Sequence, residues 1–198
     1  MPDALPFSQA AENNKIPILE VLDRHLQGAD SLLEIGSGTA QHAVYFAAHF
    51  PRLVWQATDI PAAIDTVRQR IVAADLPNLA PPLALDVDHQ PWPLSRYSAV
   101  FTANSLHIMS AASVENFFKA VGQHVDPGGK LLIYGPFKYG GEFTTESNAR
   151  FDLWLKDRDP ASGLRDFEWV GGLAERAGFS LLEDNAMPAN NQMLVWNK

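Results

Sequence analysis

Residues 32–43, LLEIGSGTAQHA, combine an acid with a glycine-rich turn that could bind a charged ligand. An apolar run leads into Gly36, Ser37 and Gly38, and a helical pattern follows them. Glycines at such a turn let backbone N–H groups approach a ligand closely at the start of a helix. Glu34 stands two residues before the first glycine. Its carboxylate would repel a pyrophosphate and would favour a ligand that carries an ammonium group.

The turn departs from the dinucleotide-binding pattern in both charge and spacing. That pattern needs G-x-G-x-x-G without an anion beside it, whereas Gln41 stands here in place of the third glycine. S-adenosylmethionine carries an ammonium group and no phosphate, so the turn suits this cofactor. A plain strand–turn–helix corner of another α/β protein is the alternative. In either case we expect Thr39 to cap the helix.

Three more polar residues are expected at the ends of successive strands. Asp59 follows the second strand about 20 residues after the turn, where a carboxylate can accept hydrogen bonds from both ribose hydroxyls. Asp86 could accept from an adenine amine, and Asn104 could meet the methionine ammonium group. Taken singly, Asp59 could instead cap a helix and Asp86 could be a loop acid. The predicted cofactor-binding residues are Glu34, Gly36, Ser37, Gly38, Asp59, Asp86 and Asn104.

These residues meet only if a parallel sheet brings its strand ends to one edge. Hydrophobic periodicity predicts strands over 31–35, 53–58, 81–87, 97–106, 130–137, 179–187 and 192–198. It predicts helices over 14–26, 39–50, 61–74, 113–124, 147–157 and 166–177, with Pro17 in the first turn of the first helix. The alternation indicates an α/β fold with a doubly wound, seven-stranded, mostly parallel sheet whose last strand is antiparallel, a Rossmann-like methyltransferase fold. We expect one domain, 1–198, with a cofactor core over 31–135 and a lid over 138–165.

The candidates for acceptor chemistry stand after the fourth and fifth strands. His107 could act as a general base, and Tyr134 and Tyr139 could line an acceptor pocket. A structural role for His107 and core packing for Tyr134 are the alternatives. The expected lid is long enough to act as a specificity element, although it could be an ordinary capping segment. Residues expected near the acceptor are Asn148, Asp152, Arg165, Asn190 and Asn191, and those expected to close over the cofactor are Asn14 and Lys15.

Composition favours a small-molecule acceptor over a nucleic acid. The 198 residues include 15 Lys and Arg against 23 Asp and Glu, which gives a formal net charge of −8 and indicates no basic face. The absence of cysteine excludes disulfides and is compatible with a reducing cytoplasm. No apolar run of about 18 residues and no signal-type stretch occurs, so we expect a cytoplasmic protein without a membrane span.

Three other patterns point to different chemistry and are disfavoured. Tyr134 and Lys138 have the Y-x-x-x-K spacing of short-chain dehydrogenases, but that pair needs a helical turn, which the intervening Gly-Pro opposes. Residues 86–89, DVDH, could supply half of a metal site, but no second cluster at ligand spacing supports one, so no metal is expected. Residues 103–108, ANSLHI, lack the N/D-P-P-Y/F run of the enzymes that methylate bases or glutamine.

The pattern E-x-G-x-G after a strand resembles motif I of the class I methyltransferases, and residues 31–135 resemble these enzymes as a whole. Segments that resemble the methyltransferase-like protein 26 family are SQAAENNKIPIL (8–19), YGPF (134–137), SNARFDLWL (147–155), GLRDFE (163–168) and MPANNQMLVW (187–196). The resemblance covers nearly the whole length and implies the fold and S-adenosylmethionine, but no particular acceptor. Two functions remain open: a methyltransferase for an unidentified small molecule, or a non-catalytic cofactor-binding or interaction module of the same fold.

Overall fold

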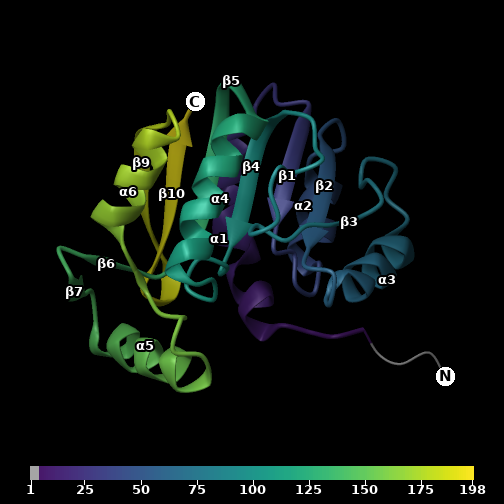
Figure 1. Ribbon diagram of the computed structural model, residues 1–198. Helices are drawn as coiled ribbons and strands as arrows, with labels where there is room; N and C mark the ends of the chain where they lie inside the picture. Colours follow the sequence, from purple (N-terminus) through teal and green to yellow (C-terminus); the bar gives the residue numbers. More distant parts are fainter. Residues whose placement is uncertain (1–4) are drawn as a thin grey trace.

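A seven-stranded sheet with helices on both faces forms the body of the protein (Figure 1). The computed structural model describes residues 5–198, so the first four residues of the expected domain 1–198 lie outside the described part. The strands of the sheet are β1 (Ser31–Ile35), β2 (Val54–Asp59), β3 (Leu83–Ala84), β4 (Tyr97–Ala103), β5 (Val125–Gly135), β9 (Ser180–Met187) and β10 (Asn191–Asn197). The helices are α1 (Gln9–His25), α2 (Gln41–His49), α3 (Ile64–Ala74), α4 (Ala111–His124), α5 (Glu146–Arg158), α6 (Phe167–Arg176) and the 3-10 turn η1 (Pro188–Asn190). None of the helices in this described part is long and apolar enough to cross a membrane.

The strand order is β3-β2-β1-β4-β5-β10-β9. Strands β1 to β5 run parallel to one another along this order. The last strand, β10, lies between β5 and β9 and is antiparallel to both. The predicted doubly wound, mostly parallel sheet with an antiparallel last strand is therefore confirmed.

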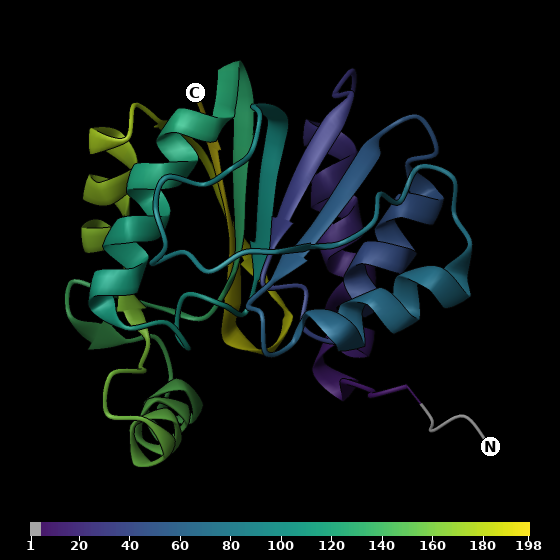
Figure 2. The same ribbon diagram turned by 45° about the vertical axis from the view of Figure 1, so that its right-hand side comes forward.

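Helices α1, α2 and α3 cover one face of the sheet, and α4 and α6 cover the other (Figure 2). Because side chains alternate along a strand, β1 contributes to both layers. Leu33 and Ile35 pack in the layer of α4 and α6, whereas Leu32 packs with Trp55 in the layer of α1 to α3. Glu34 alternates in step with Leu32, so its side chain points toward α1, α2 and α3.

The helices begin at different residues from those predicted, and α1, α2 and α3 show the local reasons. Helix α1 begins at Gln9 because the side chain of Ser8 caps it, and Pro17 lies inside the helix rather than in its first turn. Thr39 does not cap α2; Ala40, with a φ of 56°, precedes the helix without any side-chain cap. Helix α3 begins at Ile64, after a turn over 61–63.

The strand ends also differ from the prediction where the chain turns away from the sheet. β3 has only two residues, so Asp86 lies in the loop beyond it. β4 ends at Ala103, since Asn104 has a left-handed φ of 58°.

The expected lid over 138–165 contains α5 and much of a second sheet in the order β7-β6-β8. The strands of this sheet are β6 (Phe137–Tyr139), β7 (Glu142–Phe143) and β8 (Arg165–Asp166). Helix α5 lies beyond the edge of the main sheet at which the parallel strands end (Figure 1).

Candidate functional site

The turn after β1 is fixed to its neighbours by its backbone. Gly36 has a φ of +73°, and a Cβ added there would lie 2.6 Å from the hydroxyl oxygen of Ser105. The backbone N–H of Ser37 donates to the carbonyl of Thr58 at 2.9 Å. Only glycine combines a left-handed conformation with such a close approach at low cost. The fold of the turn therefore requires the first glycine of the pattern, independently of any ligand.

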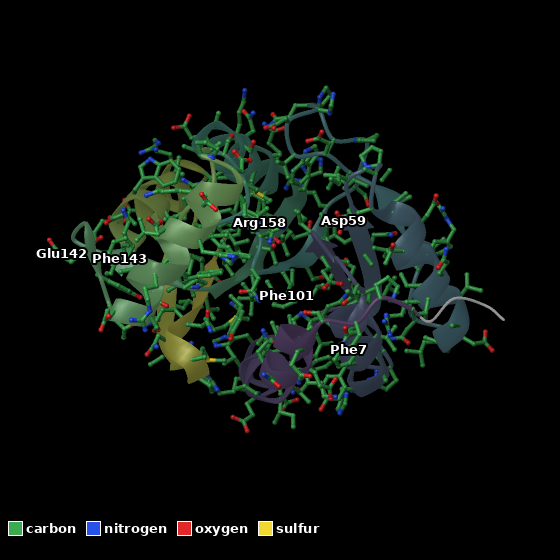
Figure 3. The ribbon with its side chains drawn as sticks, turned by 90° about the horizontal axis from the view of Figure 1, so that it is seen from below. Phe7, Asp59, Phe101, Glu142, Phe143 and Arg158 are labelled. Carbon is green, nitrogen blue, oxygen red and sulfur yellow. The ribbon has the colours of Figure 1, made fainter. Side chains whose placement is uncertain are left out.

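Asp59 joins the end of β2 to the turn after β1. Its Oδ2 accepts from the backbone N–H of Gly38 at 2.6 Å, and its Oδ1 accepts from that of Ile60 at 2.8 Å. A carboxylate has about four lone-pair sites, so about two remain for a ligand. Figure 3 views the molecule from the end at which the parallel strands terminate, with Asp59 labelled. Asp59 therefore holds the turn and also presents acceptor positions beside it.

Two cavities meet at Asp59, and we call them together the acidic cleft. The larger, about 420 Å³, lies between the turn after β1, the start of α1 and the end of β4. The smaller, about 170 Å³, extends from Asp59 to Asp86 and Asp88, and both cavities contact Gly36 and Met109. The part of the lining that the structure describes contains these three aspartates and no lysine or arginine. Such a lining opposes a phosphate and suits a cation.

Glu34 lies behind the turn rather than in the cleft. Its side chain is 2% exposed, and its Oε2 accepts a hydrogen bond from the indole N–H of Trp55 at 2.9 Å. Burial raises the pKa of Glu34 to about 7, although the hydrogen bond from Trp55 opposes the rise. The pKa of this carboxyl group is thus well above that of an exposed glutamate, and the group does not line either cavity of the acidic cleft.

The other two predicted polar residues do line the acidic cleft. Asn104 donates its backbone N–H to the carbonyl of Tyr134 at 2.8 Å and lines the larger cavity. Asp86 lines the smaller cavity. Its Oδ1 accepts from the backbone N–H of Asp88 at 3.0 Å, and its Oδ2 lies 3.0 Å from the ring of the exposed His89. The cleft therefore gathers the ends of β1, β2 and β4 and the loop after β3.

A third cavity, of about 810 Å³, adjoins the acidic cleft, and we call it the neutral cavity. It is lined by residues from α1, the ends of β4 and β5, α5 and η1. Ser8, Asn104 and Ile108 line both spaces, so the two are contiguous. Among its described lining residues there is no Asp, Glu, Lys or Arg. The predicted residues that it brings together are Asn14, Asn104, His107, Tyr134, Asn148, Asn190 and Asn191.

His107 is a buried imidazole at the wall of the neutral cavity. It is 5% exposed, and its ring meets that of Phe151 edge to face, with centroids 5.3 Å apart. Burial, together with the positive charge of Arg165, lowers the pKa of His107 to about 4. The imidazole is therefore neutral at physiological pH, which is the form that can accept a proton.

Asn14 connects the acidic cleft with the neutral cavity. Its Oδ1 lies 2.7 Å from Nε2 of His42, a buried residue that lines the cleft. Burial lowers the pKa of His42 to about 4, so its neutral ring donates to the amide oxygen. On its other side Asn14 lies near Tyr134, whose pKa burial raises. Asn14, one of the residues predicted to close over the cofactor, therefore lies next to Tyr134, a candidate for lining the acceptor pocket.

Besides Glu34, four predicted site residues lie outside all of these cavities: Lys15, Tyr139, Asp152 and Arg165. Lys15 pairs with Glu12 on α1. The hydroxyl of Tyr139 donates to Asp184 at 2.7 Å.

The remaining two of these residues hold the segment between α5 and β8. Asp152 is 2% exposed; it accepts from the backbone N–H of Leu164 at 2.7 Å and from Lys156 at 2.6 Å. Arg165 donates to the carbonyls of Leu106, Met109 and Ala161. Both residues support the cavity wall from outside.

One pair of residues that the sequence did not reveal joins α1 to α2 beside the acidic cleft. The backbone N–H of Ser8 donates to Oε1 of Gln41 at 2.6 Å, and Nε2 of Gln41 donates to the carbonyl of Ser8 at 3.3 Å. This pair fixes the start of α1 against the start of α2. In the sequence, Gln41 itself was the signal for this contact, because it stands where a dinucleotide-binding turn has its third glycine.

The DVDH segment is used within the protein. Ser113 and Asn116 donate to the two carboxylate oxygens of Asp88 at 2.8 and 2.9 Å. Within residues 5–198, no group of three or more His, Cys, Asp or Glu side chains is placed to hold a metal ion.

Comparison with known proteins gives one family match and several similar folds. A family model described as "Protein of unknown function (DUF938)" matches residues 5–198. An O-methyltransferase family protein from Burkholderia thailandensis is similar with a TM-score of 0.82 and 20% identity, over 93% of this chain and 56% of that one. Human N-acetylserotonin methyltransferase, solved in complex with S-adenosylmethionine, has a TM-score of 0.81 and 16% identity, over 96% and 53%. An O-methyltransferase family 2 protein from Planctomyces limnophilus, solved with apigenin, has a TM-score of 0.82 and 16% identity, over 96% and 58%.

These similarities establish the fold. The chain spans somewhat more than half the length of the three solved proteins. Their identities of 16 to 20% are low, but the similarity extends over nearly all of this chain. The fold is therefore the Rossmann-like fold of methyltransferases, as the order of strands and helices predicted.

Proposed function

This chain belongs to the family described as a protein of unknown function (DUF938), and we propose that it is an S-adenosylmethionine-dependent methyltransferase that acts on a small molecule. The observation that carries the proposal is the junction of the acidic cleft with the neutral cavity at Ser8, Asn104 and Ile108. Ligands in the two spaces would meet there, as the donor and acceptor of a group must. We also propose that the chain is related to the methyltransferase-like protein 26 family, on the basis of the sequence segments that resemble that family.

The side chains of the acidic cleft fit S-adenosylmethionine. Asp59 has about two lone-pair sites beyond its backbone contacts, and these would accept the ribose hydroxyls. Asp86 would accept from the adenine amine, and Asn104 would hold the methionine end together with the backbone of the turn. An acidic lining suits the ammonium and sulfonium groups of this ligand, and it would repel a dinucleotide. In this proposal Glu34 acts from behind the turn, through its charge.

The residues of the neutral cavity would orient the acceptor and exclude water. S-adenosylmethionine, when bound, supplies a methyl group activated by the adjacent sulfonium. His107 would accept the proton of the acceptor at a nitrogen of its neutral imidazole, since its ring is the one imidazole among the described residues that line this cavity. Tyr134 and Asn14 would help to orient the acceptor. Helix α5 would act as the lid that the sequence predicts over 138–165, since it contributes to the wall of this cavity.

Direct binding tests the proposal first. Isothermal titration with S-adenosylhomocysteine, the product form of the cofactor, should show one site per chain. Incubation with S-adenosylmethionine and a metabolite extract, followed by mass spectrometry, should show formation of S-adenosylhomocysteine. Failure to bind the cofactor would overturn the proposal. Binding without turnover over a broad panel of acceptors would favour the non-catalytic module in its place.

The proposal also covers partner and location. We assign a small-molecule acceptor rather than a nucleic acid, because no lysine or arginine lines the neutral cavity within the described residues. We propose a cytoplasmic location, with which the cysteine-free composition is compatible. Localisation of a tagged chain by microscopy tests the second assignment.

A further inference from the structure

The neutral cavity differs from the acidic cleft in its chemistry. Its described lining combines amide side chains with aromatic rings and contains no ionised acid or base. Its volume of about 810 Å³ is in the range of cavities that hold drug-sized molecules. The composition of this wall therefore restricts the class of molecule that can enter.

Aromatic rings run from the buried end of the cavity to its mouth. The ring of His107 meets Phe151 at a centroid distance of 5.3 Å and an angle of 73°. Phe151 in turn stacks on Trp154, with centroids 5.7 Å apart and 18° between the planes. His107 is buried, whereas Trp154 is 50% exposed. Rings arranged in this way present edges and uncovered face area to a flat aromatic ligand.

Amide groups also line the cavity and are held in place by hydrogen bonds. Nδ2 of Asn148 donates to the carbonyl of Asn190 at 3.0 Å, and Nδ2 of Asn190 donates to the hydroxyl of Ser147 at 3.1 Å. These bonds join α5 to η1, where Ala189 and Asn190 have left-handed φ values of 59° and 58°. Amides present donors and acceptors without charge, so they can recognise hydroxyl and carbonyl groups of a neutral molecule.

Three charged side chains beside this wall, those of Arg165, Arg158 and Asp152, already have partners within the protein. The guanidinium of Arg165 is bonded to three backbone carbonyls, and that of Arg158 lies over the ring of Trp154 at 4.6 Å. The carboxylate of Asp152 is bonded to Leu164 and Lys156. An ionised ligand would leave water without gaining a partner of opposite charge, which is costly.

We infer that the neutral cavity binds an uncharged, flat aromatic molecule that carries hydroxyl or carbonyl groups. The inference rests on the proposed function for the role of this molecule as methyl acceptor, but binding itself can be measured without turnover. Phe151 and Trp154 would contact the ring system. Oδ1 of Asn148 would accept from a hydroxyl group of the ligand, because the Nδ2 hydrogens of this residue already go to Thr144 and Asn190. These three residues would therefore determine acceptor specificity.

Three probes of equal ring size test the inference on the full chain. They are 2-naphthol, its 6-carboxylate and its 6-trimethylammonium derivative, titrated by calorimetry with and without saturating S-adenosylhomocysteine. The neutral probe should bind at least 10-fold more tightly than either charged probe. Equal or tighter binding of a charged probe, or no binding of 2-naphthol, would overturn the inference.

Variants locate the binding and separate this inference from the proposed function. Phe151→Leu and Trp154→Ala should each weaken 2-naphthol binding about 5-fold or more, whereas the neighbouring exposed Leu153→Ala should not. Asn13→Asp, at the rim of the cavity, should strengthen binding of the cationic probe and leave 2-naphthol unchanged. Unchanged 2-naphthol affinity in both aromatic variants would refute the site. If the wild type does not bind S-adenosylhomocysteine, the proposed function is refuted instead. The inference about the neutral cavity can still be judged in that case, because the probes are also titrated without S-adenosylhomocysteine.

Discussion

The carboxylate of Asp59 accepts a hydrogen bond from the backbone N–H of Gly38 at 2.6 Å, so the end of β2 holds the turn that follows β1. The second carboxylate oxygen accepts from the N–H of Ile60. These two contacts fix the carboxylate before any ligand arrives. A ligand would then meet preorganised acceptors and would not have to order the side chain itself.

We predict that Asp59→Ala weakens binding of S-adenosylhomocysteine by roughly 1–3 kcal/mol, because it removes the proposed ribose acceptors. Calorimetry on the folded variant measures the change. Asp65→Ala, which removes an exposed carboxylate from the first turn of α3, is the matched control and should leave the affinity unaltered. Wild-type affinity in a folded Asp59→Ala chain would remove Asp59 from the site.

The two glycines of the turn should respond differently to alanine. At Gly36 a Cβ combines a φ of +73° with a 2.6 Å approach to the hydroxyl oxygen of Ser105, whereas at Gly38 the φ is +56° and the space is open. We expect Gly36→Ala to lower the free energy of unfolding by about 1–3 kcal/mol more than Gly38→Ala does. Urea denaturation measures both values. Adding Ser105→Gly should restore part of the loss at Gly36; equal losses at the two glycines would contradict this account.

The strand ends could be predicted from the sequence, but the directions of some side chains could not. Periodicity and glycine turns locate the ends of β1, β2 and β4, and therefore bring Asp59 and Asn104 to one edge. Glu34 was expected to face the ligand. Its direction depends on alternation along β1 and on Trp55, its hydrogen-bond donor from the neighbouring strand.

In the expected lid, too, the sequence predicts the segment but not the directions of all its side chains. Its length and its aromatic content indicate a wall over the site, and Asn148 lies there. Tyr139 and Arg165 are of suitable types, but their partners are far away in the chain: Asp184 for the first and the carbonyl of Leu106 for the second. Local sequence does not encode such pairings, since they arise only when β6, β8 and β9 are assembled.

Glu34 should make the stability of the protein depend on pH. Burial raises its pKa from 4.5 to about 7, so between these values the folded chain holds a proton that the unfolded chain has lost. Stability therefore falls as the pH rises through this range. Glu34→Gln cannot ionise and keeps an oxygen for Trp55. We expect the variant to exceed the wild type by up to about 3 kcal/mol at pH 8 and to equal it at pH 4.

Urea unfolding at several pH values without cofactor measures this difference. Glu115→Gln, an exposed change on α4, is the control and should show no such dependence. A Glu34→Gln chain less stable than the wild type at pH 8 would mean that the buried carboxylate is favoured in its charged form.

Asp152 should matter for stability and not for cofactor binding. Removing its carboxylate leaves the buried N–H of Leu164 without its partner, so Asp152→Ala should cost about 1–3 kcal/mol of unfolding free energy. Asp157→Ala, an exposed change on the same helix, should cost little. The affinity for S-adenosylhomocysteine should be the same in both variants, as measured by calorimetry. Weaker cofactor binding confined to Asp152→Ala would instead connect α5 with the acidic cleft.

His107 should remain neutral well below the pH at which an exposed histidine gains its proton. Its pKa is lowered from 6.5 to about 4, so below 6.5 the unfolded chain binds a proton that the folded chain does not. Stability contributed by the neutral ring is therefore lost as the pH falls from 6.5 toward 4, by up to about 3 kcal/mol. The variant His107→Gln has no imidazole at this position and lacks this dependence. The difference in unfolding free energy between wild type and variant should therefore change by up to that amount between pH 6.5 and pH 4. Proton NMR of the six histidines, with the His107 signal identified by its absence from the variant, gives the pKa directly. A midpoint near 6.5 would show that the ring is solvated in the folded chain, and the predicted dependence of stability on pH would then be absent.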